Sequence, residues 1–167
     1  MRRETKFLTQ AAIIAAIYVV LTLTFAPISF GSANSPIQFR ISEVLTILPI
    51  FTPAAIPGLF IGCAVANINS PFGPIDTLVG SIATLVAAYF TFKLRGRKFI
   101  AMLAPAISNG LFVGSMIYFG MFQNQQFNLI GWLTAMLFVA FGEVVVCYAL
   151  GIPFMAILTK YKNVIFK

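Results

Sequence analysis

The sequence contains no histidine, a single aspartate (Asp76) and only two cysteines, Cys63 and Cys147, both within apolar segments. The absence of histidine excludes histidine-based catalytic triads, and one aspartate is too few for a two-aspartate intramembrane protease. Two such cysteines argue against a disulfide framework or a metal site of cysteine and histidine ligands. The chain also lacks a GxxxxGK[ST] motif, so it has no P-loop for ATP. We therefore predict no catalytic residue, metal site or cofactor, and energy supplied by a partner or an ion gradient.

Charged residues are also scarce. They make up 9% of the 167 residues, whereas 60% are hydrophobic, and the mean hydropathy is +0.97. A soluble globule needs more polar surface than this, so the composition predicts an all-α integral membrane protein in contact with the lipid bilayer. The net charge of +7 is better explained by topology signals than by a nucleic-acid interface.

Apolar runs separated by loops rich in Gly, Pro, Ser and Asn predict one membrane domain, residues 1–167, with six transmembrane helices. The second helix is only about 15 Å long at 1.5 Å per residue, and a re-entrant pair over residues 42–68 is the alternative. The last segment exceeds one span, and we expect it to bend near Gly151 and Pro153. The expected helices are 7–26, 42–51, 53–68, 75–92, 99–119 and 129–160.

Basic residues form three clusters that set the expected topology. Cytoplasmic loops are enriched in Lys and Arg, so an even number of crossings must separate the clusters. Four helices before the second cluster and two after it satisfy this, with both termini cytoplasmic. Arg40 is then the only basic residue on the outer side. The clusters are Arg2, Arg3 and Lys6; Lys93, Arg95, Arg97 and Lys98; and Lys160, Lys162 and Lys167.

On this topology, polar side chains gather in the outer half of the membrane and converge inward, which predicts a binding pocket open to the outside. Arg40 and Glu43 could instead form a surface ion pair, Asp76 could be a first-turn acid, and Asn109 could serve helix packing. A purely structural role is hardest to assign to Glu143, because a mid-membrane carboxylate costs roughly 2.5–3.5 kcal/mol unless it is paired, protonated or hydrated. The candidate substrate-binding residues are Arg40, Glu43, Asn67, Asp76, Asn109 and Glu143.

Small residues recur on the first helix, where Ala11, Ala12, Ala15 and Ala16 form two overlapping small-xxx-small pairs. Such pairs let another helix approach the backbone closely. The neighbour is either a helix of the same chain or a helix of a partner subunit.

Several sequence blocks carry a resemblance to a known family. The block RISEVLTILP, which begins at Arg40, continues through FTPAAIPGLFIGC, and the later blocks are IDTLVGSIATL, ISNGLFVG and GEVVVCYALGIP. Together they closely resemble the QueT family, the substrate-binding S components of energy-coupling factor (ECF) vitamin transporters. The resemblance runs from about residue 7 to residue 160, and the RISE block is its most specific part.

The resemblance implies a six-helix S component in the bacterial cell membrane. Such a subunit captures substrate outside and works with a transmembrane coupling subunit and two cytoplasmic ATPases, which use ATP and Mg²⁺. S components typically dock through small alanines of the first helix, a pattern matched by Ala11, Ala12, Ala15 and Ala16. QueT proteins are associated with queuosine precursors, which are deazaguanine bases with a nitrile or aminomethyl arm.

The candidate residues suit that substrate class. One carboxylate can accept the adjacent N–H donors of a guanine-like edge, a second can bind an amine, and Arg40 or Asn109 can donate to the carbonyl. Either Glu43 or Glu143 could take either role, with aromatic rings against the base. The alternatives are an S component for another vitamin-like ligand, an autonomous ion-coupled transporter with Glu143 as proton carrier, a membrane enzyme, and a structural helix bundle.

Overall fold

The structure is a computed structural model that describes residues 3–30, 38–121 and 126–165. Within these ranges the regular elements are all helical. They are α1 (Arg3–Thr24), α2 (Ala26–Ser29), η1 (Ile41–Ile50), α3 (Ala55–Ala66), η2 (Asn67–Asn69), α4 (Pro74–Lys93), α5 (Lys98–Ala101), α6 (Ala104–Met121), α7 (Leu129–Val145), η3 (Val146–Leu150) and α8 (Gly151–Ile165).

Four helical segments are long and apolar enough to cross a membrane, which confirms the prediction of an all-helical membrane protein. Two further apolar helices, Ile41–Ile50 and Ala55–Asn69, are shorter than a standard span. The count of six crossings therefore stays a prediction. The four long segments are Arg3–Thr24, Pro74–Lys93, Lys98–Gly120 and Leu129–Lys162.

Several helices differ from the expected ones in form or boundary, and a proline lies at each difference. The segment expected as an α-helix over 42–51 is a 3₁₀ helix, η1, with Pro49 inside it; at about 2.0 Å per residue it is roughly 20 Å long rather than 15 Å. The helix expected over 99–119 is divided between α5 and α6, and Pro105 lies in the first turn of α6. Proline lacks the N–H that helical hydrogen bonding requires, so it favours a break just before it.

The bend expected near Gly151 and Pro153 takes the form of a π-helical turn, η3, directly before Gly151. Pro153 cannot donate to the carbonyl four residues earlier, and the wider turn accommodates this loss. The region expected as a loop over Pro27–Gln38 opens with the short helix α2, and its residues 31–37 lie outside the described part of the chain.

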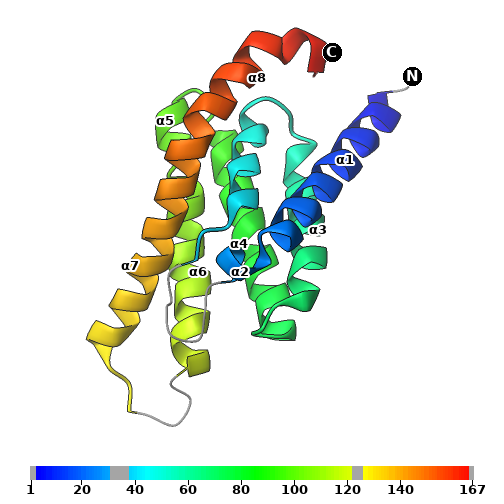
Figure 1. Ribbon diagram of the computed structural model, residues 1–167. Helices are drawn as coiled ribbons and strands as arrows, with labels where there is room; N and C mark the ends of the chain where they lie inside the picture. Colours follow the sequence, from blue (N-terminus) through cyan, green and yellow to red (C-terminus); the bar gives the residue numbers. More distant parts are fainter. Residues whose placement is uncertain (1–2, 31–37, 122–125, 166–167) are drawn as a thin grey trace.

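Helices α1, α3, α4, α6 and α7 pack in succession, and η1 lies among them against α1, α3, α4 and η3 (Figure 1). Glycines allow the closest approach between α1 and α3. A Cβ on Gly58 would lie 2.7 Å from the Ala11 carbonyl oxygen, and one on Gly62 would lie 3.0 Å from Ala15. Small residues on both helices thus let the two backbones meet.

The start of α1, helix α5 and the end of α8 lie at the same end of the bundle (Figure 1). The described basic residues of all three predicted clusters lie in these segments, at the end of α4 or in the turn between α4 and α5. Arg40 and Asp76, by contrast, lie at the start of η1 and in the first turn of α4. Since α4 ends with Lys93 at the basic end, Asp76 lies toward the opposite end.

Candidate functional site

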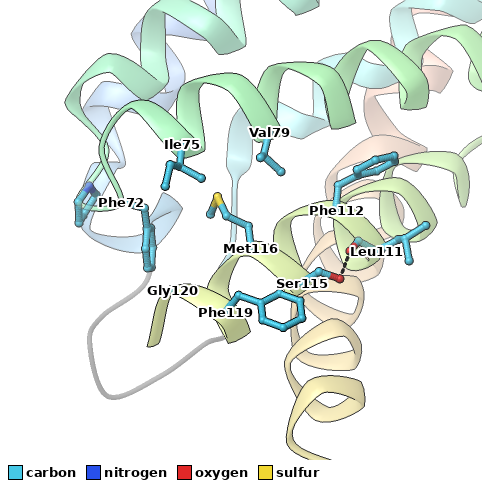
Figure 2. Close-up of a pocket in the computed structure, with 10 residues that line it drawn as sticks. Phe72, Ile75, Val79, Leu111, Phe112, Ser115, Met116, Phe119 and Gly120 are labelled. Carbon is cyan, nitrogen blue, oxygen red and sulfur yellow. Dashed lines mark hydrogen bonds between the residues drawn. The ribbon is translucent and has the colours of Figure 1, made fainter. Parts of the chain in front are cut away.

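An apolar cavity of about 700 Å³ lies between the start of α4 and the second half of α6. Its lining includes Phe72, Val79, Phe112 and Met116, and the hydroxyl of Ser115 on its wall donates to the Leu111 carbonyl (Figure 2). None of the six predicted site residues lines this cavity. The lining residues include no charged side chain, so this cavity favours an apolar group.

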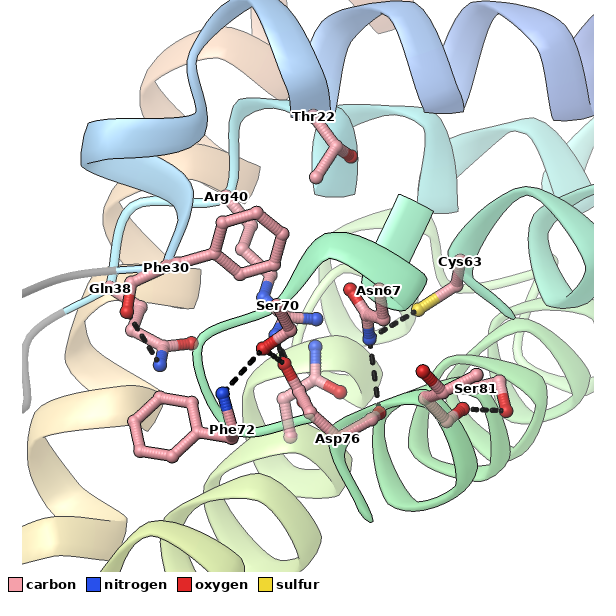
Figure 3. A network of polar contacts seen from close by, with 12 residues as sticks. Thr22, Phe30, Gln38, Arg40, Cys63, Asn67, Ser70, Phe72, Asp76 and Ser81 are labelled. Atoms are coloured by element: carbon pink, nitrogen blue, oxygen red, sulfur yellow. Dashed lines mark hydrogen bonds and ion pairs between the residues drawn. The ribbon is translucent and has the colours of Figure 1, made fainter. Parts of the chain in front are cut away.

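The predicted polar residues lie elsewhere, and Figure 3 shows three of them, Arg40, Asn67 and Asp76, near one another. Arg40 is 2% exposed, and its terminal nitrogen lies 3.3 and 3.2 Å from the two carboxylate oxygens of Asp76, which is fully buried. The surface ion pair between Arg40 and Glu43 that the sequence left open is not formed; Arg40 pairs with Asp76 instead. The ring of Phe30 lies 5.8 Å from the guanidinium, within range of a cation–π contact.

The turn before α4 holds Asp76 in position. Gly73 adopts a φ of +67°, which favours glycine, and Pro74 begins the helix. The Ser70 hydroxyl donates to the Asp76 carboxylate, and the Asn67 side-chain amide donates to the Asp76 backbone carbonyl at 3.1 Å. Asp76 is therefore a first-turn acid, but one that is buried and holds Arg40.

Glu43 lies one turn into η1 and is fully buried. One of its oxygens, Oε1, accepts hydrogen bonds from the Tyr18 hydroxyl of α1 at 2.5 Å and from the Thr84 hydroxyl of α4 at 3.3 Å. The other, Oε2, has no hydrogen-bond partner. Two neighbouring helices thus fix the orientation of this carboxylate and leave one oxygen available.

Glu143 and Asn109 form a second buried pair. The Asn109 side-chain amide on α6 donates to Oε1 of Glu143 on α7 at 2.8 Å, while Oε2 of Glu143 has no partner. A Cβ on the neighbouring Gly142 would overlap the backbone carbonyl of Gln38. The missing side chain therefore lets the segment before Arg40 lie directly against α7, which brings η1 close to Glu143.

All six predicted site residues thus lie in a buried polar cluster. Each is at most 3% exposed, and electrostatic interactions link Glu43 to Arg40 and Glu143 to Glu43. Buried polar atoms normally find partners, and an unpaired one is costly. Five of the six residues nonetheless carry an unpartnered atom: Arg40 Nε, Glu43 Oε2, Asn67 Oδ1, Asn109 Oδ1 and Glu143 Oε2.

A comparison with known families gives a match over most of the chain. The QueT transporter family matches residues 8–160. This chain belongs to the QueT transporter family. The match includes all six residues of the buried polar cluster and all four alanines of α1, so the resemblance first seen in the RISE block is confirmed at the level of the family.

A curated relative supports the same assignment. The chain is 40% identical over 87 residues to the queuosine precursor transporter QueT of Lactococcus lactis subsp. cremoris (strain MG1363). The aligned region covers 51% of this chain and 48% of that protein, so the chain spans about half the length of the curated relative it matches. No solved structure matches the chain.

Several residues of this QueT family member contribute to the cluster although the sequence did not single them out. Tyr18 and Thr84 orient Glu43, Ser70 donates to Asp76, and the Cys63 thiol accepts from the Asn67 amide at 3.5 Å. Hydroxyl and thiol groups within apolar helices are common, so composition alone does not mark them. A spacing signal was present for Cys63 and Asn67, which lie one helical turn apart.

Gly80 of α4 has no side chain, which leaves room for the polar side chains packed against it. A Cβ there would lie 2.5 Å from the Asn67 amide nitrogen and 3.1 Å from Oδ1 of Asp76. We expect Gly80→Ala to displace the Asn67 side chain and to destabilise the protein by about 1–3 kcal/mol, reduced by the better helix propensity of alanine. Thermal unfolding in detergent measures the change.

Gly96→Ala is the matched control, because a Cβ at Gly96 has no neighbour within 4 Å. We expect this variant to unfold at the temperature of the parent protein. Equal stability of the two variants would contradict close packing of the polar cluster around Gly80.

Proposed function

We propose that this QueT family member is the substrate-capture (S) component of an ECF-type importer. It binds a queuosine precursor from outside and delivers it by docking to a membrane coupling subunit. The observation that carries the proposal is the buried cluster with five unpartnered polar atoms, because a polar ligand at this position would satisfy them. The Lactococcus relative is a queuosine precursor transporter, which supports the substrate class.

A deazaguanine base complements the atoms that are available. Its ring edge presents adjacent N–H groups, which a carboxylate oxygen such as Oε2 of Glu43 can accept, and its carbonyl can accept from the Nε of Arg40. The Phe30 ring lies beside the guanidinium and offers a flat apolar surface near the same group. Asp76, with no unpartnered oxygen, positions Arg40 rather than binding the ligand.

The placement of the basic residues supports an outward-facing site. If the end of the bundle that carries Lys93 and Lys160 is cytoplasmic, as the enrichment of Lys and Arg in cytoplasmic loops requires, then both termini are cytoplasmic. Asp76 then lies in the outer half of the bacterial cell membrane.

In this proposal the chain docks to a coupling subunit, and other subunits supply the energy. Ala11 is buried and Ala15 half-buried, and both face α3, whereas Ala12 and Ala16 are exposed. The proposed docking surface is therefore the face of α1 that carries Ala12 and Ala16. The coupling subunit would pack there, and two cytoplasmic ATPases would supply energy with ATP and Mg²⁺.

Isothermal titration calorimetry on the purified chain in detergent tests substrate capture. The ligands are the aminomethyl and nitrile deazaguanine bases, with guanine as the control. We expect tight binding of at least one deazaguanine base and weaker binding of guanine, which lacks the arm. In parallel, uptake of the bound base by cells should require the ATPase partners.

Two results would contradict the proposal. Folded protein that binds neither base would direct the search to another vitamin-like ligand. Uptake that persists without the ATPases and stops with an uncoupler would instead identify an ion-coupled transporter in which Glu143 carries the proton.

A further inference from the structure

The buried polar cluster offers more hydrogen-bond acceptors than donors. Among its six residues, four unpartnered atoms are acceptor oxygens, on Glu43, Glu143, Asn67 and Asn109, and the unpartnered donor is the Nε of Arg40. A ligand that satisfies these atoms must bring several N–H groups and few acceptors. The cluster therefore favours a nitrogen-rich ligand with a surplus of donors.

The cluster also holds more negatively charged side chains than positively charged ones. Arg40 forms a salt bridge with Asp76, so its positive charge is already paired. Glu43 and Glu143 are both buried and have no such partner. Because an uncompensated buried carboxylate is costly, the cluster favours a ligand that carries positive charge.

The two glutamates differ in how well the protein already stabilises their negative charge. Glu43 accepts from two hydroxyl groups and is attracted by Arg40. Within the described part of the chain, Glu143 accepts a hydrogen bond from the Asn109 amide alone and forms no ion pair. Glu143 is therefore the carboxylate that gains most from a cation beside it.

We propose that Glu143 is the specificity-determining residue of the site and binds a primary ammonium group on the arm of the ligand. Glu43 then accepts N–H groups from the ring edge with its unpartnered oxygen. The inference rests on the proposed function, since it concerns the same site, but it assigns each glutamate to a different part of the ligand.

The experiment compares Glu143→Gln and Glu43→Gln by calorimetry on the full chain in detergent. The ligands are a matched pair, the aminomethyl base with its cationic arm and the neutral nitrile base.

The parent protein should bind the aminomethyl base more tightly. Glu143→Gln should weaken binding of the aminomethyl base by about 10- to 100-fold, the range expected for a lost charge-assisted hydrogen bond, and change nitrile binding little. Glu43→Gln should weaken both ligands by a similar factor.

The possible results separate this assignment from the proposed function. If the parent protein binds both bases with equal affinity, or if Glu43→Gln rather than Glu143→Gln removes the preference, the assignment is wrong while substrate capture stands. Equal weakening of both ligands by Glu143→Gln also overturns it. If the folded parent protein binds neither base, both proposals fail. Thermal unfolding of each variant without ligand shows that the compared proteins are folded.

Discussion

Replacing Arg40 with methionine is expected to destabilise the protein by about 3–5 kcal/mol, the usual cost of removing one partner of a buried ion pair. Asp76 is fully buried, and both of its carboxylate oxygens accept from the Arg40 guanidinium. Without the arginine, its charge would remain buried with no cationic partner, and the hydrogen bond from the Ser70 hydroxyl would not replace the ion pair. Thermal unfolding in detergent gives the measurement.

A second substitution separates loss of the ion pair from loss of packing. The double variant Arg40→Met with Asp76→Asn removes both charges and keeps an acceptor for Ser70, so we expect it to recover most of the lost stability. Arg97→Met removes an exposed arginine and should change stability by no more than about 0.5 kcal/mol. If the double variant is as unstable as Arg40→Met alone, packing rather than charge explains the loss.

The members of the polar cluster could be predicted from the sequence because the surrounding chain is so apolar. In a sequence with 9% charged residues, a carboxylate such as Glu143 or an arginine between apolar segments requires a specific partner or a function. This reasoning selected all six residues that the structure places together, although it offered no distances between them. Their role in binding is still a prediction.

The pairing within the cluster could not be predicted in the same way. Arg40 and Glu43 are three residues apart, which made them natural partners, but Arg40 contacts Asp76, 36 residues away. That contact depends on how η1 lies against α4. Spacing along the chain reports neighbours on one helix and says nothing about neighbours on another. The hydroxyls of Tyr18 and Thr84 were missed for the same reason.

Helix existence was easier to predict than helix geometry. The apolar runs located each long helix, whereas the 3₁₀ form of η1 and the π-helical turn η3 did not follow from hydropathy. Both elements lie beside a proline, Pro49 within η1 and Pro153 shortly after η3. Proline position marks where a helix must deviate, but the packing around it selects the form.

The largest expected effect on transport comes from the exposed face of α1. We expect the double variant Ala12→Leu with Ala16→Leu to abolish uptake of the precursor while leaving its affinity for the isolated chain unchanged. Both alanines are exposed and four residues apart, so they share one face where a coupling subunit could approach the helix backbone. Leucine keeps that face apolar for lipid but prevents the close approach.

Ala149→Leu is the matched control, because Ala149 is also exposed and lies in η3, which packs against η1, α7 and α8. It should preserve both uptake and binding. The α1 variant must retain binding by calorimetry for its transport defect to report docking. Normal uptake by the α1 variant would exclude this face as the docking surface. Ala11 and Ala15 would not then replace it, because Gly58 and Gly62 already bring α3 against them, and the docking surface would have to lie on another helix.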